Sequence, residues 1–204
     1  MIVSRYKARF SQAADPLVQL LVQQRVSPTA ITLASLTLII ASCVMLLMTR
    51  QVLLFCVLST LAMLGDVIDG AVARASGRTS KFGAYLDAMC DRYGEAAVVL
   101  AVAEVTGYWR LSLIVLAGAL LISYAKARAA MEVSVSNIEW PDLMERAERV
   151  VMFIVGLAAS RLIRWAPLGH DVFWWTLLLL GILIHITVLQ RILRVRSFIR
   201  TRST

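Results

Sequence analysis

The sequence predicts an all-α integral membrane protein, with six transmembrane helices and an N-terminal amphipathic interfacial helix before them. Of its 204 residues, 59% are hydrophobic, and the mean hydropathy of +0.75 is well above that of a typical soluble domain. Apolar segments of about 20 residues recur along the chain, and short polar turns separate them. The chain is too short for a second sizeable fold beside these spans, so we expect a single membrane domain over 1–204.

Residues 1–24 carry apolar side chains at helical spacing, namely Val3, Tyr6, Phe10, Ala14, Leu17 and Leu21. Arginine and lysine residues interrupt the first apolar residues, which is not the pattern of a cleavable signal peptide. We therefore expect a helix lying in the membrane interface. The alternative is a soluble helix leading into the first span.

The expected spans follow from apolar runs and their boundaries. Ser27-Pro28 is a favourable cap and first-turn pair, and a polar turn at 77–81 separates the second and third spans. A polar connection at 134–142 precedes the fifth span, and a loop with His170 precedes the sixth. The expected spans are 28–49, 51–75, 81–106, 109–128, 142–164 and 171–194, in a six-helix bundle over 28–196 that ends in a basic tail at 197–204.

The net charge of +8 comes from arginine-rich ends and loops. Six spans place both termini on one side, with 17 of the 21 lysines and arginines, and leave Arg50, Arg110, Arg161 and Arg164 opposite. The positive-inside rule then predicts a multi-pass protein of the cell membrane with cytoplasmic termini. No basic patch is interleaved with stacking aromatic residues, so we exclude nucleic-acid binding.

Cys43, Cys56 and Cys90 lie in apolar segments without motif spacing and are expected to be small buried side chains.

Four carboxylates stand out in this apolar chain: Asp66, Asp69, Asp87 and Asp91. An ionised carboxylate at membrane depth costs about 2.5–3.5 kcal/mol, so the four together cost roughly 10 kcal/mol if nothing offsets them. Asp66 and Asp69 share one helix face at i, i+3, and Asp87 and Asp91 share another at i, i+4. Two facing helices then form an all-oxygen site, which suits Mg²⁺ or Mn²⁺ better than zinc or copper.

The residues from 66 to 91 read Asp66-x-x-Asp69-Gly70-x-x-Ala73-Arg74, eight residues, Gly83-x-x-x-Asp87-x-x-x-Asp91. This pattern resembles the signature of the CDP-alcohol phosphotransferases at all eight fixed positions. Members of that family move a phosphoalcohol from a CDP-linked donor to an acceptor hydroxyl. The resemblance implies a six-helix bundle, two divalent ions, Mg²⁺ or Mn²⁺, and a homodimer.

The resemblance also implies roles for individual residues. Asp66, Asp69, Asp87 and Asp91 are the implied metal ligands, and Asp91 is also the implied base that takes the proton of the acceptor hydroxyl. The implied CDP-lipid-binding residues are Asp66, Asp69, Gly70, Ala73, Arg74, Thr79, Gly83 and Asp87. Close helix packing is the structural alternative for the glycines. Arg74 is expected to pair with a phosphate.

Basic residues near the cytoplasmic ends of later spans suggest an acceptor that carries its own phosphate. We expect Lys126, Arg146 and Arg191 to bind that phosphate, although ordinary positive-inside anchoring also explains such residues. Ser123-Tyr124-x-Lys126-Ala127-Arg128 and Glu145-Arg146-x-x-Arg149 resemble the subgroup of the family that uses inositol phosphate.

The resulting hypothesis is transfer of a phosphatidyl group from CDP-diacylglycerol, or a similar CDP-lipid, to inositol phosphate, in phospholipid biosynthesis. Glycerol 3-phosphate is the alternative acceptor. A prenyltransferase is another enzyme class with aspartates around Mg²⁺, but its aspartate motifs differ. The alternative from a different functional class is a cation transporter, in which the carboxylates would line the ion pathway.

Three other residues receive structural interpretations. Glu95 either supports the acidic site or bonds a neighbouring helix. His170 is expected in the outer loop, and His185, on an apolar span, is expected to make a hydrogen bond within the helix packing rather than to bind a metal.

Overall fold

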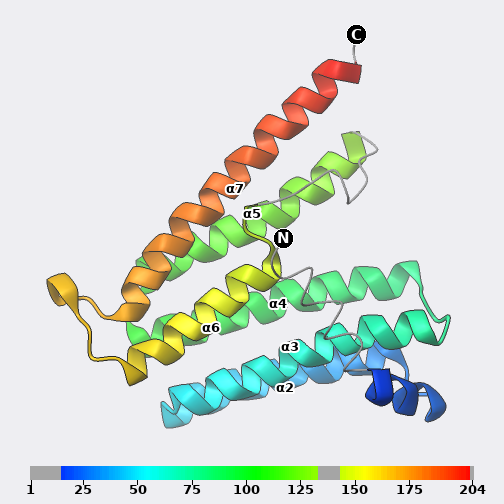
Figure 1. Ribbon diagram of the computed structural model, residues 1–204, viewed down its shortest axis with the longest axis horizontal. Coiled ribbons are helices and arrows are strands. Elements are labelled where there is room, and N and C mark those ends of the chain that lie inside the picture. Colours follow the sequence, from blue (N-terminus) through cyan, green and yellow to red (C-terminus); the bar gives the residue numbers. More distant parts are fainter. Residues whose placement is uncertain (1–14, 133–142, 203–204) are drawn as a thin grey trace. The chain divides into compact units, whose positions relative to one another are not determined.

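The computed structural model of the chain describes residues 15–132 and 143–202 (Figure 1). Regular structure in these two ranges is entirely helical, which confirms the all-α prediction. The chain divides into two compact units, Met1–Gly107 and Tyr108–Thr204. Each unit is described by itself below.

The first unit contains α2 (Pro28–Thr49), α3 (Val52–Ala75) and α4 (Lys81–Thr106). α2 is central to the unit, because both α3 and α4 pack against it. The bounds of these helices agree with the predicted spans to within one residue. Residues 15–23 are also helical, whereas Val3, Tyr6, Phe10 and Ala14 of the predicted amphipathic helix lie outside the described residues.

Local capping explains where these helices begin and end. The Ser27 hydroxyl accepts a hydrogen bond from the Ala30 amide (3.1 Å), and Pro28 occupies the first helical position. Ser80 caps α4 in the same way, since its hydroxyl accepts from the Gly83 amide at 2.9 Å. α4 ends at Gly107, whose φ of 76° is a left-handed conformation that favours glycine.

The second unit contains α5 (Trp109–Glu132), α6 (Arg146–Leu162), the short 3₁₀ helix η2 (Pro167–Gly169) and α7 (Val172–Arg202). α7 packs against both α5 and α6. α6 starts four residues later than expected, because Glu145 caps it: the Glu145 amide donates to the Glu148 carboxylate at 3.1 Å. α7 continues to Arg202, through most of the expected tail, in a stretch without glycine or proline. The predicted connection at 134–142 lies outside the described residues.

Small side chains allow close helix contacts in the second unit. A Cβ added at Gly156 of α6 would lie 2.7 Å from the Cβ of Thr176 on α7. One added at Gly118 of α5 would lie 2.8 Å from Cε1 of His185, also on α7. The Nδ1 atom of His185 is 2.9 Å from the Gly181 carbonyl oxygen, so this hydrogen bond of the histidine lies within α7, while its ring packs against Gly118 of α5.

Four helices among the described residues are long and apolar enough to cross a membrane: α2, α3, α5 and α7. α4 is interrupted by charged residues, including Asp87, Asp91, Arg92 and Glu95. α6 has 17 residues, a length of about 26 Å, which is shorter than the roughly 30 Å hydrocarbon core. The chain is therefore a multi-pass membrane protein, and the count of six spans stays a prediction.

The remaining structural predictions concern cysteines and the outer-loop histidine. Cys43, Cys56 and Cys90 are buried, as expected, and none of the three forms a disulfide within the described residues. His170 directly follows η2, and its ring stacks on Trp174 at a centroid distance of 4.0 Å. This histidine therefore lies in the predicted loop and contributes to packing at the start of α7.

Candidate metal centre

Three of the four predicted acidic residues converge in the first unit. Asp66 and Asp69 lie on α3, Asp87 lies on α4, and each offers a carboxylate oxygen within 4.8 Å of the other two. Asp69 is buried, with 5% of its surface exposed, and the other two are half-buried. We call Asp66, Asp69 and Asp87 the acidic cluster.

The geometry and chemistry of the acidic cluster fit a divalent cation. Two oxygens bound to one Mg²⁺ at about 2.1 Å lie at most about 4.2 Å apart, so small side-chain movements suffice to bring these oxygens onto an ion. The donor set contains only carboxylates, the ligand type that Mg²⁺ and Mn²⁺ prefer. Three carboxylates at this separation repel one another in a partly buried site, and a cation relieves that repulsion.

A hydroxyl from α2, the helix of the unit that contributes no aspartate, contacts the acidic cluster. Thr32 of α2 donates a hydrogen bond from Oγ1 to Oδ2 of Asp69 at 2.5 Å. Thr32 is itself buried, with 8% exposed. α2 therefore contributes a polar contact to the cluster as well as the surface on which α3 and α4 pack.

The glycines of the motif have different local surroundings. A Cβ at Gly70 would have Nη1 of Arg74 as its nearest neighbour, at 3.4 Å, and no neighbouring helix within 4 Å. Helix packing in the described structure thus does not account for Gly70, and the Arg74 guanidinium lies beside it. At Gly83, a Cβ would lie 2.9 Å from the Ser80 hydroxyl, so helix capping is a structural reason for this glycine. Ala73 is half-buried, and Thr79 is exposed in the turn before α4.

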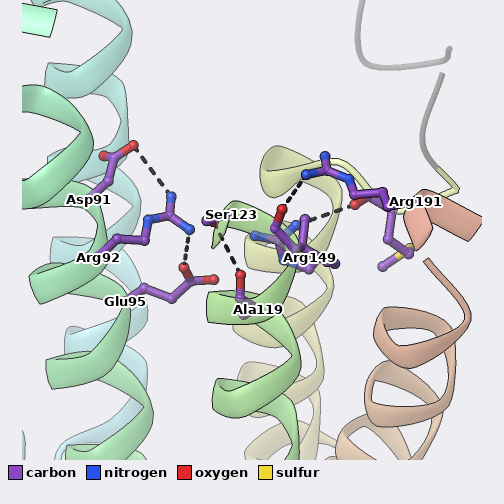
Figure 2. A network of polar contacts seen from close by, with 9 residues as sticks. Asp91, Arg92, Glu95, Ala119, Ser123, Arg149 and Arg191 are labelled. Atoms are coloured by element: carbon purple, nitrogen blue, oxygen red, sulfur yellow. Dashed lines mark hydrogen bonds and ion pairs between the residues drawn. The ribbon is translucent and has the colours of Figure 1, made fainter. Parts of the chain in front are cut away.

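Asp91 lies one turn beyond Asp87 on α4 and is not among the three residues of the acidic cluster. Figure 2 shows Arg92 between two carboxylates, with Nη2 3.6 Å from Oδ2 of Asp91 and Nη1 2.8 Å from Oε2 of Glu95. Glu95 therefore pairs with Arg92 on its own helix. The catalytic and metal-binding roles of Asp91 stay predictions.

The predicted acceptor residues all belong to the second unit. Lys126 on α5 is exposed, and Arg146 at the start of α6 is half-buried. Arg191 on α7 is 5% exposed, and its Nη1 donates to the Ile122 carbonyl of α5 (Figure 2). The pairing of Arg191 with a backbone carbonyl links α7 to α5.

Arg92 and Thr32 were not singled out in the sequence, and Arg149 was named there only as part of a motif. Arg149 on α6 is 4% exposed and donates to the Met144 carbonyl at 3.3 Å (Figure 2). The i, i+3 spacing of Arg92 and Glu95 is a sequence signal for their ion pair. For Thr32, the available signal is its place near the start of one span, because consecutive spans are antiparallel and the aspartates lie near the end of the next span.

Comparison with known proteins agrees with the resemblance seen in the motif. Residues 25–187 match the family model of CDP-alcohol phosphatidyltransferases. A phosphatidylinositol phosphate synthase of Corynebacterium glutamicum is 33% identical over 175 residues, covering 80% of this chain and 76% of the relative. An archaetidylinositol phosphate synthase of Pyrococcus horikoshii is 27% identical over 156 residues, covering 76% and 81%.

Solved structures agree in fold. A crystal structure of Mycobacterium tuberculosis phosphatidylinositol phosphate synthase with CDP-DAG bound has a TM-score of 0.74 and 28% identity, covering 88% of this chain and 92% of that one. The same protein in complex with manganese and citrate has a TM-score of 0.77 and 26% identity, covering 89% and 88%. The family match spans most of the sequence and includes the whole acidic motif. The chain belongs to the CDP-alcohol phosphatidyltransferase family.

Proposed function

We propose that this protein transfers a phosphatidyl group from CDP-diacylglycerol, or a similar CDP-lipid, to inositol phosphate, and that it releases CMP. The observation that carries the proposal is the acidic cluster of Asp66, Asp69 and Asp87, in a chain of this family. Relatives named phosphatidylinositol phosphate synthase support inositol phosphate as the acceptor. Relatives bound to CDP-DAG and to manganese support the donor and the metal.

The proposed reaction is a substitution at the lipid-side phosphorus of the donor. The acceptor hydroxyl oxygen forms a bond to this phosphorus, the bond to the bridging oxygen breaks, and CMP leaves with that electron pair. Asp91 takes the proton of the hydroxyl, as the family pattern implies. When bound, divalent ions neutralise the diphosphate and stabilise the attacking and leaving oxygens.

Residues on α3 and α4 are proposed to hold the CDP-lipid. Gly70 and Arg74 support this role, because the guanidinium lies beside a glycine surface that no neighbouring helix covers in the described structure. Arg74 is exposed and positively charged, so it can pair with a phosphate of the donor. Ala73, Thr79 and Gly83, together with the three aspartates of the acidic cluster, complete the proposed donor site. Gly83 also has a role in capping α4.

Lys126, Arg146 and Arg191 are proposed to bind the phosphate of the acceptor. Basic side chains at such positions distinguish a phosphorylated acceptor from a free alcohol. Arg191 is nearly buried, which supports a role beyond anchoring at the membrane surface. Arg191 donates to the Ile122 carbonyl through Nη1, and its planar guanidinium has the geometry to bind a phosphate.

The proposed topology has six spans, with the termini and the catalytic site at the cytoplasmic face. The distribution of lysine and arginine supports this orientation. A cytoplasmic site also gives the water-soluble CMP a way out. Residues 1–24 are proposed to lie in the interface, and exposed Leu17 and Leu20 in the helical part of this segment support that placement. The homodimer remains a proposal from the family resemblance.

A substrate panel tests the function. Purified protein is incubated with CDP-diacylglycerol, Mg²⁺ or Mn²⁺, and inositol phosphate, glycerol 3-phosphate, inositol or serine, and the lipid product is identified by mass spectrometry. We expect phosphatidylinositol phosphate and CMP, in a metal-dependent reaction. Cation transport without nucleotide turnover would contradict the proposal, and a phosphatidylglycerol phosphate product would change the acceptor.

Two variants test the assigned residues. Asp91→Asn is expected to abolish CMP release with folding intact, because the amide cannot take the proton. Arg146→Ala is expected to raise the KM for inositol phosphate and leave the KM for the CDP-lipid unchanged. Persistent turnover in the first variant, or an unchanged acceptor KM in the second, would show that the respective assignment is wrong.

A further inference from the structure

The contact between Thr32 of α2 and Asp69 of α3 joins two buried side chains that are 37 residues apart in sequence. Thr32 is in the second turn of α2, and Asp69 is in the last third of α3. The hydrogen bond is 2.5 Å long, which is typical of a hydroxyl that donates to an ionised carboxylate. Asp69 is also the most buried member of the acidic cluster.

Close approach of α2 and α3 makes this contact possible. Ser35 lies one turn after Thr32 on α2, and Gly65 lies one turn before Asp69 on α3, as expected for an antiparallel pair. A Cβ added at Gly65 would overlap the Ser35 hydroxyl. Because Gly65 has no side chain, the two helices come near enough for the short threonine side chain to reach the carboxylate.

The hydroxyl has a second acceptor in reach. Oγ1 of Thr32 is 3.1 Å from the Pro28 carbonyl, one turn earlier on its own helix. A threonine carries a single hydroxyl hydrogen, and the nearer, charged acceptor is Asp69. The hydroxyl therefore donates to Asp69 rather than to the Pro28 carbonyl. A carbonyl one turn earlier on the same helix is the usual acceptor for a threonine in an apolar helix.

The consequence for Asp69 is a defined carboxylate orientation. Rotation about χ2 of aspartate is broad, so burial alone does not aim its oxygens. Thr32 restrains this rotation with a rigid β-branched side chain and introduces no charge that competes with a cation. A carboxylate offers about four lone-pair sites, so it can accept the Thr32 hydrogen bond and bind a cation at the same time.

We propose that Thr32 is a positioning residue of the metal site: its hydroxyl orients Asp69 so that the acidic cluster binds a divalent cation. The inference deepens the proposed function and rests on its metal centre. Groups that orient metal ligands typically change metal affinity by about 10–100-fold when they are removed.

Three variants separate the hydroxyl from the shape of the side chain. Thr32→Val keeps the branched shape and loses the hydroxyl, whereas Thr32→Ser keeps the hydroxyl and loses the methyl group. Thr37→Val is the matched control, because Thr37 lies on the same helix and its hydroxyl donates to the Leu33 carbonyl at 2.8 Å. Metal binding is measured from the loss of the electron paramagnetic resonance signal of free Mn²⁺.

We expect Thr32→Val to raise the Kd for Mn²⁺ by about 10-fold or more, and Thr32→Ser and Thr37→Val to bind within about threefold of wild type. In the turnover assay, Thr32→Val should need more Mn²⁺ for half-maximal activity and recover most of its kcat at saturation. Thermal unfolding without metal checks that each variant is folded. If Thr32→Val does not fold, Thr32→Ala takes its place against Thr32→Ser.

Wild-type Mn²⁺ affinity in the folded hydroxyl-deficient variant would overturn the inference. An equal loss of affinity in Thr32→Ser and Thr32→Val would also overturn it, because packing of the methyl group would then be responsible. Both results leave the proposed function intact. If the wild-type protein itself bound no Mn²⁺, the metal centre of the proposed function would fail together with the role of Thr32.

Discussion

The two compact units use polar residues in opposite ways. In the first unit, the aspartates of α3 and α4 gather in one place, and a hydroxyl from α2 bonds one of them. In the second unit, the buried polar residues include arginines, and Arg191 and Arg149 donate to the backbone carbonyls of Ile122 and Met144. The first arrangement concentrates negative charge, and the second uses positive side chains partly to join structural elements.

Individual glycines differ in how closely the neighbouring helix approaches them. A Cβ at Gly94 of α4 would make ordinary contacts with α2, at 3.7 Å and beyond. A Cβ at Gly156 of α6 would lie too close to the β-carbon of Thr176, which no rotamer change can move. Close packing at a glycine therefore matters in both units, at Gly65 and at Gly156, and the first unit must in addition balance the charge of its acidic cluster.

The largest expected effect comes from removal of one negative charge of the cluster. Asp69→Asn keeps the size of the side chain and an oxygen that can accept from Thr32, but loses a charged ligand. We expect CMP release to fall by about 100-fold or more, since carboxylate ligands hold the metal. Glu104→Gln, an exposed carboxylate on the same helix as Asp87, is the control and should keep wild-type turnover.

Metal addition sharpens the comparison between the units. At a Mn²⁺ concentration about 100 times its Kd, the free energy of unfolding should rise by about 2.7 kcal/mol, because the ion binds only the folded protein. Hydrogen exchange should show new protection in α3 and α4 and little change in α6. Equal protection in both units, or the same stabilisation in Asp69→Asn, would contradict a local metal site in the first unit.

A packing variant tests the second unit. Gly156→Ala forces α6 and α7 apart at Thr176, and we expect it to lower the free energy of unfolding by about 1–3 kcal/mol. Gly181→Ala is the matched control, because its Cβ would lie 3.5 Å from the nearest atom, the Cγ2 of Ile114. Denaturation of the two variants in the same detergent measures the difference. Loss of Mn²⁺ binding in folded Gly156→Ala would show that the cluster depends on this packing.

The smallest expected effect is a change in stability at alkaline pH. Burial raises the pKa of the Tyr108 hydroxyl above its ordinary value of 10, and the neighbouring Asp171 carboxylate raises it further. The unfolded chain loses this proton near pH 10 and the folded chain only at higher pH, so stability should fall as the pH rises above 10. Tyr108→Phe should make that fall shallower, whereas Tyr93→Phe, at an exposed tyrosine, should not.

Most helix bounds were predictable because their causes are local. Apolar runs, a Ser-Pro start and the polar turn at 77–81 predict α2, α3 and α4 to within one residue. The end of α7 was less predictable, because the basic segment after 196 contains no residue that stops a helix. The motif spacing also predicted the acidic cluster, since residues three and four apart share a helix face.

The sequence by itself determined the membrane-embedded helical class, the acidic residues and the family, because these depend on composition, periodicity and spacing. Tertiary structure alone decided that Thr32 reaches Asp69 and that Arg191 bonds a carbonyl of α5. Such contacts join distant segments and depend on how closely two helices approach. That distance is decided by the side chains between the helices, as at Gly65 and Ser35, and no local pattern records it.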